Sequence, residues 1–257
     1  MKALIAALQF LTVLPLPVPA NWSIGERELR RSVLFFPVVG LLMGAAVAAL
    51  DLGLTRALPA APAAVLVVLA LLLFSGGLHM DGLADTADGF LSSRPRERIL
   101  EIMKDSRSGP MAIAVVTCVL ALKMAVVASL PEAGRWQALV LMVLAGRCVL
   151  VVQMNALPYA RPDGGLASVF RKDKTGPRRG IESVWACVVL GLAAWLLLAL
   201  PGLVAAGAVV LTILLFCLHS YRKIGGFTGD TLGAGCEISE AAAGLCVVAW
   251  THAGGAL

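Results

Sequence analysis

The sequence predicts an all-α fold, a polytopic integral membrane helix bundle with about six or seven transmembrane helices plus a short N-terminal helix. Of the 257 residues, 59% are hydrophobic and only 14% are charged. A soluble domain carries about 25% charged residues, so this chain has too little polar surface to cover a water-soluble globule. Six or seven spans of about 20 residues would occupy half of the chain or more. We therefore expect a single integral membrane domain over residues 1–257 and exclude a cytosolic enzyme.

The first four spans are predicted from uncharged or nearly uncharged segments. Residues 32–50 and 57–80 contain no Asp, Glu, Lys or Arg. At about 1.5 Å of rise per residue, each is long enough to cross about 30 Å of hydrocarbon. Residues 110–130 and 136–157 follow with a short turn between them, and they predict a helical hairpin.

The C-terminal third predicts two spans and leaves a seventh open. Residues 183–221 are uncharged and too long for one pass. Pro201 and Gly202 near the middle predict a break, because proline removes a hydrogen-bond donor and glycine favours a turn. The last apolar stretch, residues 241–257, is short and contains glycines, so it does not by itself establish another span.

The basic residues predict the orientation of the bundle. Six spans place segments 20–31, 92–108, 158–182 and 219–237 on one side, and these carry 16 of the 21 Lys and Arg residues. Loops rich in Lys and Arg face the cytoplasm. In a membrane protein, the net charge of +5 indicates orientation and contact with anionic lipids, not nucleic acid.

Residues 1–20 resemble a secretory signal, with Lys2, an apolar run and a small-residue end. Cleavage would leave the basic residues of segment 27–31 outside, against the charge pattern. We therefore expect an uncleaved short helix, interfacial or re-entrant, ended by Pro15, Pro17 and Pro19.

Three aspartates follow the second predicted span at helical spacing. If residues 78–89 are helical, Asp81, Asp85 and Asp88 lie within about 60° of one another on one face. Like charges so close repel each other and favour a bound cation. Oxygen ligands without Cys or His select Mg²⁺, Mn²⁺ or Ca²⁺. A solvated helix end is the alternative. His79 falls on another face, where a structural role is favoured over a catalytic one and both stay open.

Two further segments bring acidic residues to the same side. Residues 94–109 predict a short amphipathic helix, in which Glu101 and Asp105 lie one turn apart among basic residues. This pattern is typical of a solvated salt-bridged face, but folded back on the aspartates it could complete a two-metal site. Residues 225–237 contain five glycines, whose backbone amides could approach phosphate near Gly229 and Thr231. Asp230 and Glu237 are spaced i, i+7 if a helix begins there.

Two cations lie inside predicted spans. Lys123 and Arg147 each need an anionic partner, because burying an unpaired cation inside a span costs about 3 kcal/mol or more of free energy. Structural pairing and direct function stay open for both. The basic cluster of residues 171–179 is expected to contact lipid headgroups, with a bound nucleotide as the alternative.

The three glycine–acid motifs closely resemble cobalamin synthase, the adenosylcobinamide-GDP ribazoletransferase family. They read G-G-L-H-M-D-G-L-A-D-T-A-D-G at 76–89, E-I-M-K-D-S-R-S-G at 101–109, and G-G-F-T-G-D-T-L-G-A-x-x-E at 225–237. The likeness extends to residues 8–17, 36–40, Lys123 and 145–147, and so covers nearly the whole chain.

The resemblance implies a catalytic domain that forms the nucleotide loop of adenosylcobalamin. A hydroxyl of alpha-ribazole, or of its 5′-phosphate, would attack the corrinoid-linked phosphorus of adenosylcobinamide-GDP and expel GMP, with Mg²⁺ required. In the implied site, Asp81, Asp85 and Asp88 would hold metal, with Glu101, Asp105 and Asp230 as further participants. Asp81, Asp85, Arg107 and Arg147 would be catalytic, and the cofactor-binding residues would be His79, Lys123, Gly229 and Thr231.

The same resemblance implies an enzyme of the bacterial cytoplasmic (inner) membrane with its active site facing the cytoplasm. Membrane lipids are expected partners, and a homo-oligomer is allowed. A phospholipid synthase of the CDP-alcohol phosphotransferase class is the first alternative, but Asp85 stands where its signature has Arg. A cation or corrinoid transporter is the second alternative. The acidic residues of a transporter should lie near the middle of the bilayer, whereas those of this chain gather at one end of the spans.

Overall fold

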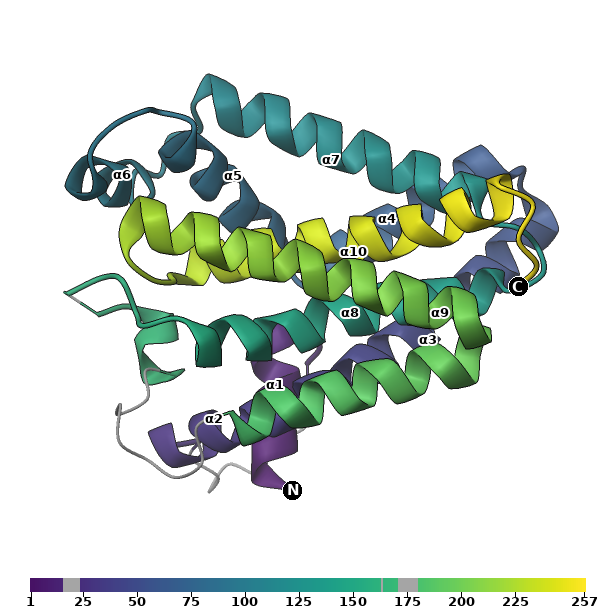
Figure 1. The fold of residues 1–257 in the computed structure, drawn as a ribbon, viewed down its shortest axis with the longest axis horizontal. Helices are drawn as coiled ribbons and strands as arrows, with labels where there is room; N and C mark the ends of the chain where they lie inside the picture. The colour runs from purple at the N-terminus through teal and green to yellow at the C-terminus, as the bar shows by residue number, and fades with distance from the viewer. Residues whose placement is uncertain (16–23, 163, 171–179) are drawn as a thin grey trace.

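The structure is a computed structural model that describes residues 1–15, 24–162, 164–170 and 180–257. Most of the described chain is helical, which confirms the all-α prediction (Figure 1). The α-helices are α1 (Lys2–Leu11), α2 (Glu26–Ser32), α3 (Phe36–Ala57), α4 (Ala60–Phe74), α5 (Leu78–Phe90), α6 (Arg96–Ile102), α7 (Pro110–Ser129), α8 (Arg135–Ala156), α9 (Ile181–Ile224) and α10 (Gly229–His252), with short 3-10 turns at Val33–Phe35 and Leu166–Phe170.

Five stretches of helix are long and apolar enough to cross a membrane. They are α2 and α3 together, α7, α8, α9 and α10, and the bent pair of α4 and α5 makes a sixth if it is taken as one broken span. The predicted spans at 32–50, 110–130 and 136–157 match α3, α7 and α8. The protein is therefore a polytopic membrane protein.

The α8 helix forms the centre of the bundle. Apolar residues lie on every side of it and most are buried, as expected of a helix packed between others. It packs against α3, α9 and α10. The α7 and α9 helices instead leave large apolar side chains such as Ile113 and Leu196 exposed. Lipid hydrocarbon is the environment in which such surfaces are stable.

The α9 helix is broken near its middle, as Pro201 and Gly202 predict. Ala199 has non-helical backbone angles, with φ of 49° and ψ of −128°. The two halves run in opposite directions in Figure 1. Proline is suited to the first turn of a helix, where its missing N–H has no partner to lose. The break therefore falls just before Pro201, and the two predicted spans are present.

The prediction of one continuous span over residues 57–80 was wrong. The α4 helix ends at Phe74, and α5 leaves it at an angle of 90°. Gly76 and Gly77 both have positive φ, a conformation that glycine adopts without steric cost. The two glycines thus turn the chain, and the aspartates begin a separate helix.

The structure defines the two terminal elements, of which the sequence left the last one open. The last helix begins at Gly229, ahead of the apolar stretch that starts at residue 241, so it has 24 residues and enough length to span a bilayer. The N-terminal helix ends at Leu11, before Pro15. Pro17 and Pro19 lie outside the described residues.

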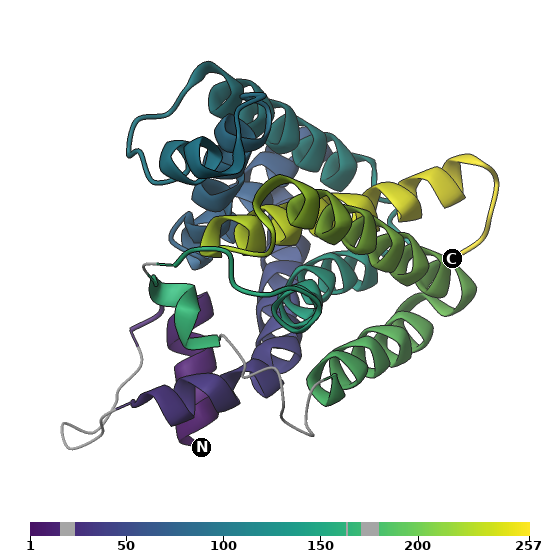
Figure 2. The same ribbon diagram turned by 60° about the vertical axis from the view of Figure 1, so that its left-hand side comes forward.

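The connections that carry the sequence motifs meet at one end of the bundle. Figures 1 and 2 show the α5–α6–α7 connection, the segment after α8 and the α9–α10 turn together there. The α3–α4 and α7–α8 turns lie at the other end. The basic segments predicted to share one side of the membrane are thus gathered at one end wherever the structure describes them.

Candidate active site

The α5 and α10 helices approach each other backbone to backbone beside the aspartates. A Cβ added to Gly82 would lie 2.7 Å from the carbonyl oxygen of Asp230, and one added to Gly233 would lie 2.8 Å from that of His79. Real Cβ atoms do not come so close to backbone atoms, so only glycine is accommodated. These glycines therefore bring Asp230 next to the α5 aspartates. Close helix packing explains the positions of Gly82 and Gly233.

Three carboxylates lie within electrostatic reach of one another at this contact. Asp85 is half-buried and is acted on by the negative charges of Asp230 and Asp81. Arg161 supplies a positive charge to the same group. Asp81 is exposed and, like Asp85, occupies the predicted face of α5. The helical stripe expected for these two residues is present, and Asp230 joins it from α10.

Arg161 is the cation beside these carboxylates, and it lies outside the three glycine–acid motifs. Its Nη2 atom donates hydrogen bonds to Asp230 Oδ2 at 2.6 Å and to the Met103 carbonyl oxygen at 3.2 Å. The preceding segment is pinned to Phe227: the Ala160 amide donates to the Phe227 carbonyl, and the Phe227 amide donates to the Pro158 carbonyl, both at 2.9 Å. This pairing fixes Arg161 beside the start of α10.

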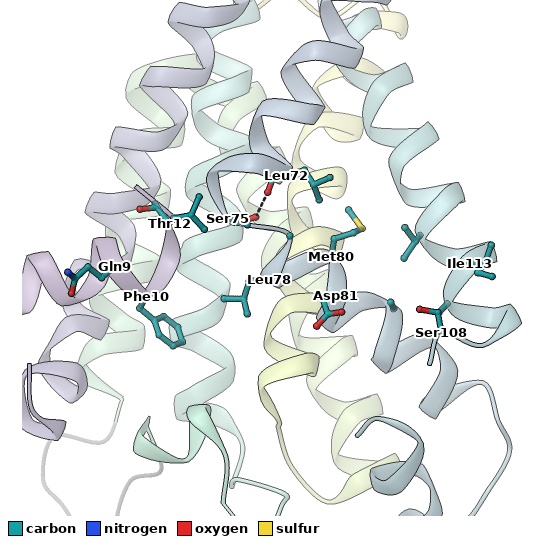
Figure 3. Close-up of a pocket in the computed structure, with 16 residues that line it drawn as sticks. Gln9, Phe10, Thr12, Leu72, Ser75, Leu78, Met80, Asp81, Ser108 and Ile113 are labelled. Atoms are coloured by element: carbon teal, nitrogen blue, oxygen red, sulfur yellow. Dashed lines mark hydrogen bonds between the residues drawn. The ribbon is translucent and has the colours of Figure 1, made fainter. Parts of the chain in front are cut away.

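Two cavities meet at Asp81. The larger has a volume of about 740 Å³ and lies among α1, the α4–α5 turn and α7 (Figure 3). Its walls are mostly apolar, with Phe10 on the α1 side and Ile113 on the α7 side, and Ser108 lies near Asp81. The smaller cavity, about 160 Å³, is lined by polar groups that include His79, Arg161 and Asp230. A ligand in either cavity can therefore contact the Asp81 carboxylate.

A third cavity, of about 540 Å³, lies on the other side of Arg161. It is lined by charged residues of the α6 region, among them Arg96, Glu101 and Lys104. Arg161 and Tyr159 line both this cavity and the smallest one. Arg161 thus forms part of the wall between the 160 Å³ cavity and the 540 Å³ cavity.

Asp88 caps the N-terminus of α7. Its two carboxylate oxygens accept hydrogen bonds from the backbone amides of Gly109, at 2.5 Å, and Ala112, at 2.8 Å. A carboxylate at a helix N-terminus satisfies unpaired N–H groups and interacts favourably with the helix dipole. Asp88 therefore ties α5 to α7 and positions the segment that carries Ser108.

The acids of the α6 region are paired with neighbouring arginines. Arg98 donates to Glu101 at 2.6 Å, and the guanidinium of Arg107 donates to both oxygens of Asp105, at 3.0 and 2.7 Å. Hydrogen bonds from Arg107 lower the pKa of Asp105 to about 2. Both pairs are solvent-exposed, so they cost little to open when a ligand binds.

The two cations predicted inside spans belong to one buried ion-pair network. Lys123 Nζ donates to Glu237 at 2.8 Å and to Glu240 at 2.5 Å, and Arg147 also donates to Glu240. All four side chains are almost fully buried between α7, α8 and α10. The network thus supplies the anions that Lys123 and Arg147 require, and it places Arg147 inside the bundle.

The remaining candidates differ in their surroundings. His79 is buried and lines the 160 Å³ cavity, as does the exposed Gly229. Thr231 is buried; its hydroxyl accepts the Thr228 amide at 2.8 Å and closes the first turn of α10. The basic cluster of residues 171–179 lies outside the described residues.

The donor chemistry of the site suits a hard divalent cation. Carboxylate oxygens are the preferred protein ligands of Mg²⁺. Within the described ranges, however, no three Asp, Glu, His or Cys side chains already stand close enough to hold a metal. Asp230 is engaged by Arg161 and Asp88 by the α7 N-terminus. The carboxylates thus fit Mg²⁺ in their chemistry and lie close together, but Asp230 would have to leave Arg161 to bind the metal.

Comparison with known proteins identifies the family. Residues 3–249 match the family described as cobalamin-5-phosphate synthase. This chain belongs to that family. It is 36% identical to the adenosylcobinamide-GDP ribazoletransferase of Acetivibrio thermocellus over 241 residues, 93% of this chain and 94% of the relative. The protein of the same name from Stutzerimonas stutzeri is 42% identical over 243 residues, 94% and 96% of the two chains. That from Citrobacter koseri is 41% identical over 233 residues, 88% and 91%.

Membership of the cobalamin-5-phosphate synthase family confirms the resemblance that the three glycine–acid motifs carry. All three motifs lie within the matched residues. No solved structure matches the chain significantly. The present fold therefore shows where the motifs of this family lie. The motifs at 76–89 and 225–237 meet at the contact between α5 and α10, and the motif at 101–109 leads into α7, the helix that Asp88 caps.

Proposed function

We propose that this chain is an adenosylcobinamide-GDP ribazoletransferase. It transfers the adenosylcobinamide-phosphate moiety of adenosylcobinamide-GDP to alpha-ribazole, or to alpha-ribazole 5′-phosphate, and releases GMP. The relatives that carry this name match more than nine-tenths of their own length to this chain. The observation that carries the proposal is the position of Asp81, on the boundary of two cavities and beside Asp85 and Asp230.

The cavities suit the two parts of adenosylcobinamide-GDP, the corrinoid and the nucleotide. The 740 Å³ cavity has the size for a bulky group, and the exposed polar side chains of Gln9 and Ser108 in its lining are available to the amides of a corrin ring. The cavities on either side of Arg161 bring charged side chains to phosphates and a nucleotide: Arg161 lines both, and Arg96 and Lys104 line the 540 Å³ cavity. The diphosphate would then lie near Asp81, where the cavities meet.

The chemistry is a displacement at phosphorus. The attacking ribazole hydroxyl oxygen forms a bond to the corrinoid-linked phosphorus, and the bond from that phosphorus to the bridging oxygen breaks. That oxygen leaves with GMP. The hydroxyl must also lose its proton, and the exposed Asp81 carboxylate is available at the junction to accept it.

Mg²⁺ is proposed as the cofactor, with Asp81, Asp85 and Asp230 as its ligands. When bound, the metal would neutralise charge on the diphosphate and on the leaving phosphate. The protein residues hold it beside both cavities and orient the two substrates. Repulsion between Asp85, Asp81 and Asp230 supports this assignment, because a divalent cation removes it.

The site is proposed to face the cytoplasm from the inner membrane of a bacterium. The basic segments that meet at this end of the bundle support that orientation. A nucleotide-activated substrate would then reach the site from the cytoplasm, while α1, with exposed apolar residues beyond it such as Val13, lies at the lipid boundary.

The proposal is tested by measuring GMP release from adenosylcobinamide-GDP and alpha-ribazole by the purified protein in lipid, with and without Mg²⁺. We expect Mg²⁺-dependent release that Asp81→Asn abolishes. Glu132→Gln removes a carboxylate at the other end of the bundle and should leave release unchanged. No release by the wild-type protein, with either substrate form, would contradict the proposed function.

A further inference from the structure

Arg161 pairs with Asp230, a proposed metal ligand, and lies where a phosphate of the substrate would bind. It binds Asp230 at 2.6 Å, and its charge acts on Asp85. Its own segment is fixed by backbone pairing with Phe227, and Arg96 strengthens that fixation by donating to the carbonyl oxygens of Ile224 at 2.7 Å and Ala160 at 3.1 Å. The backbone is therefore held, and only the long side chain of Arg161 has freedom to move.

The hydrogen bonds of the Arg161 guanidinium are incomplete. Nη2 has two partners, but Nε is buried without a hydrogen-bond partner among the described residues. An unsatisfied buried donor costs free energy until an acceptor reaches it. A phosphate presents several acceptor oxygens and matches the fork of an arginine in a bidentate arrangement. The open Nε and the two adjoining cavities therefore suit a phosphate group.

We infer that Arg161 is an exchangeable counter-ion, which neutralises Asp230 in the unliganded protein and binds a phosphate of the diphosphate substrate once metal takes its place at Asp230. This inference rests on the proposed function and assigns the phosphate-binding cation of its site. The exchange conserves charge pairing: Asp230 passes from the guanidinium to the metal, and the guanidinium passes from a carboxylate to a phosphate. It also accounts for the absence of a ready-made metal site among the described side chains.

Loss of the Arg161 guanidinium should change the affinities for metal and for diphosphate in opposite directions. Removing the guanidinium should free Asp230 and tighten metal binding, whereas it should weaken binding of a diphosphate. A merely structural arginine would weaken both, because its loss would disturb the segment between the cavities. Metal affinity therefore separates the two roles without any measurement of turnover.

The experiment uses the full-length protein in lipid nanodiscs, with Mn²⁺ binding followed by electron paramagnetic resonance and inorganic pyrophosphate binding followed by calorimetry in Mg²⁺. For Arg161→Gln we expect Mn²⁺ to bind about threefold or more tightly and pyrophosphate to bind about tenfold or more weakly, the size of a lost charge-assisted contact. Arg56→Gln is the matched control, since it removes an exposed arginine of α3 at the opposite end of the bundle, and both affinities should stay at the wild-type values.

Arg161→Lys keeps a positive charge but not the fork, so it carries the test if Arg161→Gln does not fold. We expect it to bind pyrophosphate several-fold more weakly than the wild type. Weaker Mn²⁺ binding by a folded Arg161→Gln, or unchanged pyrophosphate binding in either variant, would overturn the inference while the wild-type protein still bound both ligands. Failure of the wild-type protein to bind Mn²⁺ and pyrophosphate would instead overturn the proposed function.

Discussion

Gly82 lies against the backbone of Asp230, with room for hydrogen and not for a methyl group. A Cβ at this position would be 2.7 Å from the Asp230 carbonyl oxygen and 2.9 Å from its Cα. The contact joins the first glycine–acid motif to the third. It places Asp81 and Asp85, which flank Gly82, beside an acid almost 150 positions later in the chain.

Gly82→Ala should therefore separate α5 from α10. Overpacking of this kind costs about 1–3 kcal/mol, and we expect the free energy of unfolding to fall by that amount and GMP release to fall with it. Gly207→Ala is the control, because a Cβ at Gly207 meets nothing within 4 Å and alanine is the better helix former by about 1 kcal/mol. Equal effects of the two substitutions on unfolding in detergent would show that the contact does not constrain the site.

Asp88 and Asp81 should differ in what they contribute. Asp88→Ala removes the cap of α7 and should lower the free energy of unfolding by about 1–2 kcal/mol. Asp81→Asn removes one of several repelling charges, so it should leave stability unchanged or slightly higher while it abolishes turnover. Parallel thermal unfolding and GMP release measurements check this contrast, and a loss of stability confined to Asp81→Asn would reverse the two assignments.

The buried network should make Glu240 important for stability. Glu240→Gln leaves Lys123 and Arg147 with one carboxylate between them, and breaking a buried ion pair costs about 3–5 kcal/mol. Glu101→Gln removes an acid from an exposed pair and should have no measurable effect on unfolding. Titration with sodium dodecyl sulfate compares the two variants, and a Glu240→Gln protein as stable as the wild type would show that the network is not needed.

The proposed orientation predicts which loops are accessible from outside the cell. A cysteine at Ser92 should react with a membrane-impermeant maleimide only after the membrane is opened, whereas one at Glu132 should react in intact cells. The wild-type protein gives the background from its own six cysteines. Labelling of residue 92 in intact cells would show that the site faces away from the cytoplasm.

The helical spacing of Asp81 and Asp85, the break near Pro201 and most span positions could be predicted from the sequence, because each depends on neighbours along the chain. The span over residues 57–80 could not, since hydropathy does not register the turn that Gly76 and Gly77 make possible. The start of α10 stayed open in the sequence, because its glycines and acids are compatible with a loop or a helix until they are packed against α5 and α8.

The hydrogen-bond and ion-pair partners of the site residues could not be predicted from the local sequence, because they lie far away along the chain. Asp88 accepts hydrogen bonds from amides 21 and 24 positions away, and nothing in its own motif indicates a cap. The need of Lys123 and Arg147 for anions was predictable, but their shared use of Glu240 depends on three packed helices. Arg161 could not be identified as a site residue, because only the pairing of its segment with Phe227 brings it to Asp230.

Binding of one divalent cation by Asp81, Asp85 and Asp230 at the junction of the cavities can be measured by an electron paramagnetic resonance titration of Mn²⁺ against the purified protein in lipid. We expect Asp81→Asn, Asp85→Asn and Asp230→Asn each to weaken Mn²⁺ binding tenfold or more, about 1.4 kcal/mol, whereas Asp88→Asn should keep the wild-type affinity. Wild-type affinity in all three variants would show that these carboxylates do not hold the cation.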